Sequence, residues 1–493
     1  MINDDKDLFE SICALKSQYF KLAKDALREG VLEVGKVRDA GKYIGKYYDF
    51  PNLSFGKNGL PKLSSAIGNG PPEYRSCFVS YGGDAHIKEN ELTSFKNLVD
   101  FVRSNPSLYR RFVIDLKTEN AREITHDAGP VIIISCIKDT VERYLHRYKE
   151  SQFEDEKAAD VLASTISYIF NRQLNIDIAI PILFLRFDFD EFELTDQIFV
   201  RKISDGEQKA RYKIKSYNTS VHDSVVNCAT HALVFKNWSV ENAESMWFFD
   251  ILTNASAYPI DQIDQFFGAL RICSSIKTGY SQIYAVAQGW EASCMADLPH
   301  LNGVTVRSYP SLFEEFYWNS DDVPEISCRK MNEVKVVFEK IRSAKENAIS
   351  LALKRLNRCL VRDDEEDAVL DATIALEALL SDGNQEMTHK LAMRVGALSK
   401  IAENSTMTPA QAFSDIKNIY GYRSAIVHGS KNPDKKRLIK KADEKSATAH
   451  DLLIEYLRMT LMVLLKNERY RNPSVIDEEL LLGLHGTLDE SGN

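Results

Sequence analysis

The chain of 493 residues is 44% hydrophobic and 27% charged, and its formal net charge at pH 7 is −9. This length exceeds one ordinary hydrophobic core, so we expect two or three domains. The negative balance excludes a protein that holds nucleic acid through a global basic field. Any contact with RNA or DNA has to come from a local basic patch.

The cysteines and the N-terminus indicate the compartment. Eight cysteines are scattered singly without a CxxC pair, which argues against a zinc ribbon or a disulfide framework and fits a reducing cytosol. The N-terminal MINDDKDLFE is acidic and lacks the layout of a signal peptide. No apolar run approaches the roughly 20 residues that span a bilayer. We therefore expect a cytoplasmic protein with no membrane partner.

Residues 1–330 mix helical and strand-like patterns. We predict helical structure over 5–48 and a loop or an irregular excursion for the Pro-, Gly- and Ser-rich stretch 51–72. GPVIIISC, residues 129–136, is short, β-branched and bounded by Gly-Pro, which favours a buried strand over a helix. The region is expected to be mixed α/β, and a division near residue 150 would split it into two subdomains.

Two stretches of this region carry candidate metal ligands. Alternation through 187–190 places Asp188 and Asp190 on one strand face, and paired carboxylates suit hard cations. His222 could add a ligand, but no further set stands at a supporting spacing, so a half-exposed strand with a solvated face is favoured. The GxGxxG, P-loop, HExxH and GxSxG motifs are absent from the sequence. We expect no metal and no cofactor. Among the functional hypotheses for this chain, a metal-dependent active site in residues 1–330 is the least favoured.

From residue 331 the chain reads as successive amphipathic helices. In the first part of this region apolar residues recur at +4, +3, +4 and +3, namely at Val337, Ile341, Ala344, Ala348 and Leu351. Helices with one apolar stripe each, joined by short turns, predict an antiparallel bundle over 331–468. An acidic tail, 469–493, follows and is expected to be poorly ordered. The predicted fold class is α+β multidomain, a mixed α/β region followed by an all-α bundle.

A helix predicted over 408–428 begins with Thr408 as N-cap and Pro409 at the first helical position. Its apolar stripe runs through Phe413, Ile416, Tyr420, Arg423 and Val427. The removal of an unpaired guanidinium from water is costly in free energy. An arginine on this apolar stripe, which forms the seam between packed helices, therefore needs an ion-pair partner or a cavity that receives an anion. Glu377, a lone carboxylate in IALEALL, could pair with Arg423 or with Arg394 across the bundle.

His428 ends this helix, and Gly429 is a natural C′ residue that can re-aim the backbone. An ideal helix separates Arg423 and His428 by about 140°, whereas a helix end lets the two side chains converge. Imidazole can take the proton of a ribose 2′-hydroxyl or protonate a leaving oxygen. A guanidinium can hold the scissile phosphate bidentately. One histidine supplies half of an acid–base pair, so a second copy from a partner subunit would be useful.

Three ordered stretches, RLNRCL…EEDAVLDATIALEALL, KLAMRVGAL and IYGYRSAIVHG, lie between residues 331 and 468. Together they resemble the Apea-like branch of the HEPN superfamily. The resemblance implies an all-helical domain with an Arg-x4-6-His motif, in which Arg423 and His428 are the catalytic pair of a dimeric, metal-independent endoribonuclease. Many such proteins act in phage defence, abortive infection or toxin–antitoxin systems. Active members often carry Asn, Asp or His after the arginine, whereas this chain has Ser424, which could still donate to phosphate.

Residues 431–445, directly after the motif, carry seven basic and three acidic residues. They form either a patch that contacts the RNA backbone or a solvated loop. The candidate contacts are Lys431, Lys435, Lys436, Arg437, Lys440 and Lys441. Tyr420 and Tyr422 flank the arginine and could stack on a base or pack within the bundle.

These observations lead us to expect an endoribonuclease effector that acts against phage and binds RNA as a homodimer or higher homo-oligomer. Residues 1–330 would gate it in response to an unidentified trigger, such as a phage component. The alternative is a non-catalytic HEPN module for RNA binding, partner binding or dimerisation, in which Arg423 forms a structural ion pair with Glu377.

Overall fold

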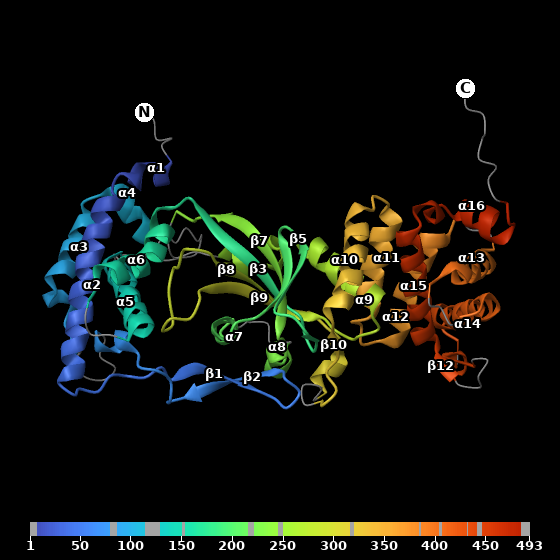
Figure 1. Cartoon of the computed structure of the whole chain (residues 1–493), viewed down its shortest axis with the longest axis horizontal. Coiled ribbons are helices and arrows are strands. Elements are labelled where there is room, and N and C mark those ends of the chain that lie inside the picture. Colours follow the sequence, from blue (N-terminus) through green and yellow to red (C-terminus); the bar gives the residue numbers. More distant parts are fainter. Residues whose placement is uncertain are drawn as a thin grey trace, which may run out of the picture. The chain divides into compact units, whose positions relative to one another are not determined.

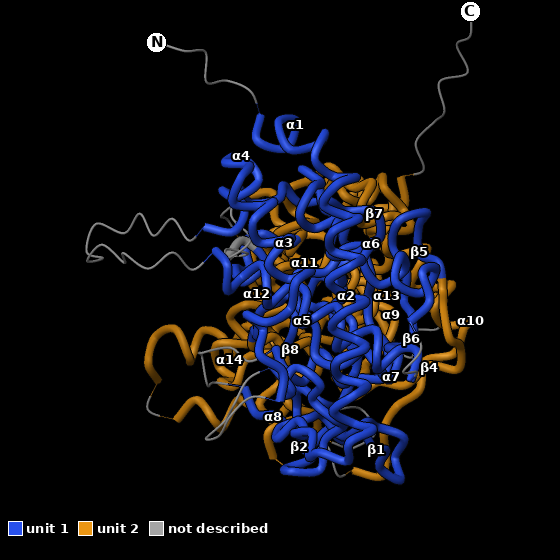
Figure 2. Tube along the Cα trace, turned by 90° about the vertical axis from the view of Figure 1, so that its left-hand side faces the viewer, with its two compact units in different colours: residues 1–181, 193–258, 282–306 blue, residues 182–192, 259–281, 307–493 orange. Residues whose placement is uncertain are grey.

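The computed structural model describes residues 7–78, 86–113, 129–149, 153–214, 221–244, 250–315, 320–383, 386–403, 407–430, 432–440 and 446–484. The chain divides into two compact units, coloured separately in Figure 2. Unit 1 consists of Met1–Pro181, Glu193–Tyr258 and Gln282–Val306, and unit 2 of Ile182–Phe192, Pro259–Ser281 and Arg307–Asn493. Each unit therefore combines three segments of the chain.

The N-terminal part of unit 1 is a group of helices around one hydrophobic core (Figure 1). Its main helices are α1 (Leu8–Cys13), α2 (Lys16–Asp39), α3 (Thr93–Arg103), α5 (Gly129–Tyr148) and α6 (Asp155–Phe170), with the short α4 (Pro106–Tyr109) after α3. Helix α2 contacts α3, α5 and α6. At Gly30 a Cβ atom would lie 2.6 Å from Val141 of α5, so the glycine allows the two helices to approach closely. The helical prediction for residues 5–48 is confirmed for α1 and α2.

The prediction of a strand at 129–136 is wrong, because GPVIIISC forms the first two turns of α5. Burial along this stretch follows a helical period: Ile132, Ile133, Cys136 and Ile137 are buried, while Val131 is 66% exposed. The polar residues that follow continue this period to Tyr148. Packing of one face against the unit 1 core outweighs the strand preference of the β-branched run.

The prediction of a loop at 51–72 is also wrong. Strands β1 (Asp49–Phe55) and β2 (Pro61–Ile67) form an antiparallel hairpin in which Leu53 pairs with Leu63. The Gly and Pro residues that suggested a loop include an Asn58-Gly59 step, which is itself a strong hairpin signal. Gly59 has φ +77°, and Asn58 accepts a hydrogen bond from the Leu60 amide.

A six-stranded sheet in the order β5-β6-β7-β3-β8-β9 follows, and most of its residues belong to unit 1. The strands are β3 (Gln173–Pro181), β5 (Glu191–Thr195), β6 (Ile198–Lys202), β7 (His231–Glu241), β8 (Tyr280–Ala287) and β9 (Leu301–Ser308). Strand β3 pairs antiparallel with β7 and β8, and its apolar end is buried without alternation. The short helices α7 (Asp205–Arg211) and α8 (Asp223–Asn227) lie between β6 and β7 along the chain.

Unit 2 is mainly helical, with α9 (Ile260–Cys273), α10 (Cys328–Ser343), α11 (Asn347–Cys359), α12 (Glu365–Leu380), α13 (Met387–Ile401), α14 (Pro409–Val427) and α15 (Ala449–Lys466). Helix α15 contacts each of the helices α9 to α14 and buries side chains all round, as a central helix does. Two small sheets join β4 (Arg186–Phe187) to β10 (Glu325–Ile326) and β11 (Leu438–Lys440) to β12 (Ser446–Thr448). The expected mixed α/β region followed by a helical C-terminal region is confirmed.

The expectation of a poorly ordered tail is wrong for residues 469–484. They form a 3₁₀ turn, the short helix α16 (Pro473–Val475) and a π-helical turn (Ile476–Leu481). Arg394 of α13 explains why, since its side chain is fully buried and donates to both carboxylate oxygens of Asp477 at 2.9 and 2.6 Å. Asp382 and the carbonyl of Leu380 accept its remaining hydrogen bonds. Arg394 is therefore not the partner of Glu377.

Candidate functional site at the end of α14

Both ends of α14 have the predicted caps. The Thr408 side chain accepts a hydrogen bond from the Gln411 amide at 3.2 Å, and Pro409 takes the first helical position. At the other end Gly429 has φ +60°, and the amides of Gly429 and Ser430 donate to Ile426 and Ala425. These are the two bonds of a Schellman motif with Gly429 at C′. The chain thus leaves the helix directly after His428.

Arg423 lies at the border of the buried face of α14, with 33% of its side chain exposed. The seam prediction is wrong for Val427, which is 49% exposed. Tyr420 of the predicted stripe is buried, and Ile419, Tyr422 and Ala425 share the buried face with it. Tyr420 and Tyr422 are both buried, so they pack within the helices rather than offering a ring to a base.

Glu377 of α12 is the acidic neighbour of Arg423. Nη2 of Arg423 lies 3.8 Å from Oε1 of Glu377, an ion-pair distance that is too long for a hydrogen bond. Among the described residues, neither Nε of Arg423 nor the hydroxyl of Tyr420 has a hydrogen-bond partner. Burial and then the negative charge of Glu377 raise the pKa of Tyr420, whereas the charge of Arg423 lowers it. The side chains of Arg423, Glu377 and Tyr420 therefore form one electrostatic cluster. Its N–H and O–H donors are not all used within the described part of the chain.

His428 and Ser424 are both exposed near the end of α14. The imidazole of His428 makes no hydrogen bond with any residue that the structure describes. Five residues separate Arg423 from His428, which corresponds to an axial rise of about 7.5 Å. Both side chains reach solvent within the last turn and a half of the helix. Their convergence on one phosphate stays a prediction.

The basic segment after the motif packs beside α14. Lys435, Lys436, Arg437 and Lys440 are exposed, whereas Lys431 and Lys441 lie outside the described residues. Nζ of Lys436 donates to the carbonyl of Gly421 at 3.4 Å, and no carboxylate of the described residues pairs with it.

Arg437 is the exception in this segment, because it forms a bidentate ion pair with Glu365 at 2.9 and 2.5 Å. Sequence reasoning did not foresee this pair. The signal for it was the acidic first turn of α12, Glu365-Glu366-Asp367. Lys435 and Lys440 have no acidic partner within the described part of the chain, so they are the members of the patch best suited to phosphates.

The candidate metal ligands of the earlier region have separate structural tasks. Asp188 lies just after the short strand β4, and its carboxylate accepts the Cys328 amide at 2.7 Å at the start of α10. The ring of His222 accepts the Ser224 amide at 3.2 Å and caps α8. Among the described residues no group of three or more His, Cys, Asp or Glu side chains could hold a metal ion.

No protein-family model, no curated protein and no solved structure matches this chain. None of the described helices combines the length and the apolar character needed to cross a bilayer. The HEPN resemblance therefore stays a hypothesis that rests on the residues quoted above.

Proposed function

We propose that this chain is a metal-independent endoribonuclease of the HEPN type, with Arg423 and His428 as its catalytic pair. The observation that carries the proposal is the state of Arg423. Its side chain is one-third exposed, its contact with Glu377 is longer than a hydrogen bond, and its buried Nε has no partner among the described residues. A purely structural arginine would be expected to use these donors inside the fold.

The chemistry follows from the two side chains. His428 would accept the proton of a ribose 2′-hydroxyl, whose oxygen attacks the adjacent phosphorus while the bond to the 5′-oxygen breaks. A second imidazole, from the other copy in a homodimer, would protonate the departing 5′-oxygen. Arg423 would bind the phosphate oxygens as negative charge develops on them. The products would be a 2′,3′-cyclic phosphate and a 5′-hydroxyl end, and no metal takes part in these steps.

The neighbouring basic segment would hold the RNA backbone. Lys435, Lys436 and Lys440 are exposed beside α14, and no carboxylate of the described residues neutralises them. Contacts of this kind fix the strand but carry no sequence information. Ser424, exposed next to Arg423, would donate a further hydrogen bond to a phosphate oxygen.

We further propose that the nuclease serves in phage defence by abortive infection, with residues 1–330 holding it inactive until a trigger arrives. This part rests on the resemblance and on the cost to a cell of an RNase that is always active. The trigger would act on the N-terminal region.

A second candidate function has one observation in its favour. Glu377 lies in the same electrostatic cluster as Arg423 and Tyr420. If that cluster serves only to join α12 and α14, the bundle would be a non-catalytic module for RNA binding, partner binding or dimerisation.

Expression in cells separates these functions. Wild type, Arg423→Ala, His428→Ala and the same-helix control Lys417→Ala are compared for growth, phage protection and integrity of total RNA. Lys417 is exposed and lies on α14 outside the proposed pair. If the chain is a nuclease, RNA is expected to be degraded in the strains with wild type and with Lys417→Ala, and to stay intact in the other two. Intact RNA in all four strains under phage infection, with folded protein in each, would favour the non-catalytic module.

A further inference from the structure

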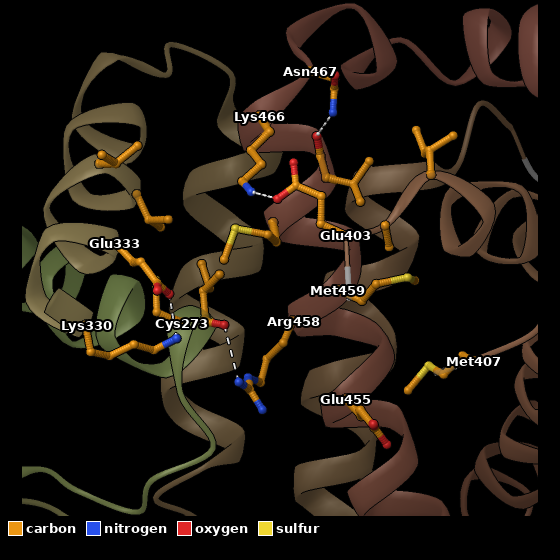
Figure 3. Close-up of a pocket in the computed structure, with 17 residues that line it drawn as sticks. Cys273, Lys330, Glu333, Glu403, Met407, Glu455, Arg458, Met459, Lys466 and Asn467 are labelled. Carbon is orange, nitrogen blue, oxygen red and sulfur yellow. Dashed lines mark hydrogen bonds and ion pairs between the residues drawn. The ribbon is translucent and has the colours of Figure 1, made fainter. Parts of the chain in front are cut away.

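A pocket of about 770 Å³ lies within unit 2 (Figure 3). Helices α9, α10 and α15 form its walls together with the end of α13 and, from the connection between α13 and α14, Ala402, Glu403 and Met407. The volume falls within the roughly 300–1,000 Å³ typical of ligand sites. Aliphatic and thioether side chains form much of the wall, and none of the described residues that line the pocket is aromatic.

Two of the three cations in the pocket are already neutralised. Nζ of Lys330 lies 2.6 Å from Glu333, and Nζ of Lys466 lies 2.6 Å from Glu403. In Figure 3 a dashed line joins the two side chains of each pair. These lysines therefore keep little attraction for a further anion.

Arg458 of α15 is the third cation, and its situation differs. One nitrogen, Nη2, donates to the carbonyl of Ile272 at 3.3 Å, and Nε is buried without a hydrogen-bond partner among the described residues. No carboxylate of the described residues forms an ion pair with it. Burial is the main cause that lowers the pKa of Arg458 below its ordinary value.

Three fully buried arginines of this chain show how such donors are satisfied within a fold, although the Nε of buried Arg143 has no hydrogen-bond partner among the described residues. Arg111 donates to three backbone carbonyls, and Arg211 donates to four carbonyl oxygens of the backbone and of glutamine side chains. Arg394 binds two carboxylates and a carbonyl. Arg458 has one acceptor and faces a cavity, so its remaining N–H groups are available to a ligand.

We infer that this pocket binds an aliphatic carboxylate, with the carboxylate on the guanidinium of Arg458 and the hydrocarbon body against Met407, Met459 and Met462. A single unpaired guanidinium matches one negative charge, and its fork matches a carboxylate. Glu333 and Glu403 are paired with lysines, so Glu455 is the remaining carboxylate among the described lining residues, and its negative charge disfavours a doubly charged phosphate more than a singly charged carboxylate. Flexible methionine side chains adapt to an alkyl chain, whereas a nucleobase would call for aromatic side chains on which to stack.

Titration calorimetry on the full-length protein tests this inference with dodecanoate, dodecanol and dodecyltrimethylammonium, each below its micelle-forming concentration. Dodecanoate is expected to bind with one site per chain and at least tenfold more tightly than the neutral or cationic probe. Arg458→Met, which keeps the apolar volume, is expected to weaken dodecanoate at least tenfold. The control Arg329→Met, an exposed position on α10 outside the pocket lining, is expected to bind as wild type does.

A second variant leaves Arg458 in place. Val336 lines the pocket from α10 and is 49% exposed, so Val336→Trp can fill the cavity from its rim without disturbing the core. It is expected to abolish binding. The inference is overturned if dodecanoate does not bind, if dodecanol binds equally well, or if folded Arg458→Met and Val336→Trp both bind as wild type does.

Discussion

Nη2 of Arg423 on α14 lies 3.8 Å from Oε1 of Glu377 on α12, so the two charges attract without sharing a hydrogen bond. The side chains are 33% and 20% exposed, which places the pair between a solvent-screened contact and a buried ion pair. The glutamate therefore attracts the guanidinium of Arg423, whose N–H groups have no hydrogen-bond acceptor among the described residues.

Glu377→Gln tests this relationship through stability. Because solvent screens the pair and no hydrogen bond is lost, the free energy of unfolding is expected to change by less than about 1 kcal/mol. Urea denaturation followed by circular dichroism measures it. A loss of several kcal/mol, matched by the same loss in Arg423→Ala, would mean that the pair holds α12 to α14 as the non-catalytic alternative requires.

Asp477→Ala tests the buried ion pair that secures the end of the chain. The substitution leaves the fully buried Arg394 with only Asp382 and the Leu380 carbonyl, so the free energy of unfolding of unit 2 is expected to fall by about 2–4 kcal/mol. Denaturant midpoints measure the effect. The exposed neighbour Glu478 supplies the matched control Glu478→Ala, which is expected to stay within about 0.5 kcal/mol of wild type. Equal effects of the two variants would contradict this description.

The same cluster predicts an acid-dependent loss of stability. Hydrogen bonding to Arg394 lowers the pKa of Asp382 from 3.8 to about 2. A carboxyl whose pKa is lower in the folded state contributes stability above its unfolded pKa and loses it as the pH falls through the folded pKa. Stability is thus expected to decline between about pH 4 and pH 2. In Asp382→Asn this part of the decline is expected to be smaller, as urea midpoints at pH 5, 3 and 2 would show. An identical pH profile for variant and wild type would exclude this role.

Salt dependence of RNA binding tests the basic segment. Each phosphate contact with a single strand contributes about 0.7 to the slope of log K against log salt concentration. Lys435→Ala and Lys440→Ala are each expected to weaken binding and to reduce this slope by about that amount. Fluorescence anisotropy with an unstructured RNA measures both quantities. Lys345→Ala, at an exposed lysine between α10 and α11, serves as the control. A slope that none of these variants changes would identify 431–445 as a solvated loop.

Short-range signals made the ends of α14 predictable. Thr408-Pro409 and His428-Gly429 determine caps through bonds within a few residues, and those bonds are present. The helical structure of the C-terminal region was likewise predictable, from the +3 and +4 spacing of its apolar residues.

Long-range packing explains what the sequence could not reveal. Arg394 and Asp477 are 83 residues apart, and nothing in the local pattern links them. The strand prediction at 129–136 failed because the face that the core buries, and not β-branching, decides the structure of α5. Tyr422 was not part of the predicted apolar stripe of α14 but is buried, so the buried face lies to one side of that stripe and Arg423 lies at its border. The sequence carries no signal for Arg458, because only the three-dimensional arrangement shows that none of the described carboxylates forms an ion pair with it.

RNA cleavage in EDTA by the full-length chain, purified from phage-infected cells so that residues 1–330 no longer hold the nuclease inactive, tests the central claim most directly. Wild type, His428→Ala and Lys417→Ala are incubated with end-labelled RNA, and the product ends are identified. The account predicts that wild type and Lys417→Ala leave 2′,3′-cyclic phosphate ends, and that His428→Ala is slower by at least a hundredfold, within the range that general acid–base catalysis supplies. Cleavage by His428→Ala at the wild-type rate, or cleavage that EDTA abolishes, would contradict it.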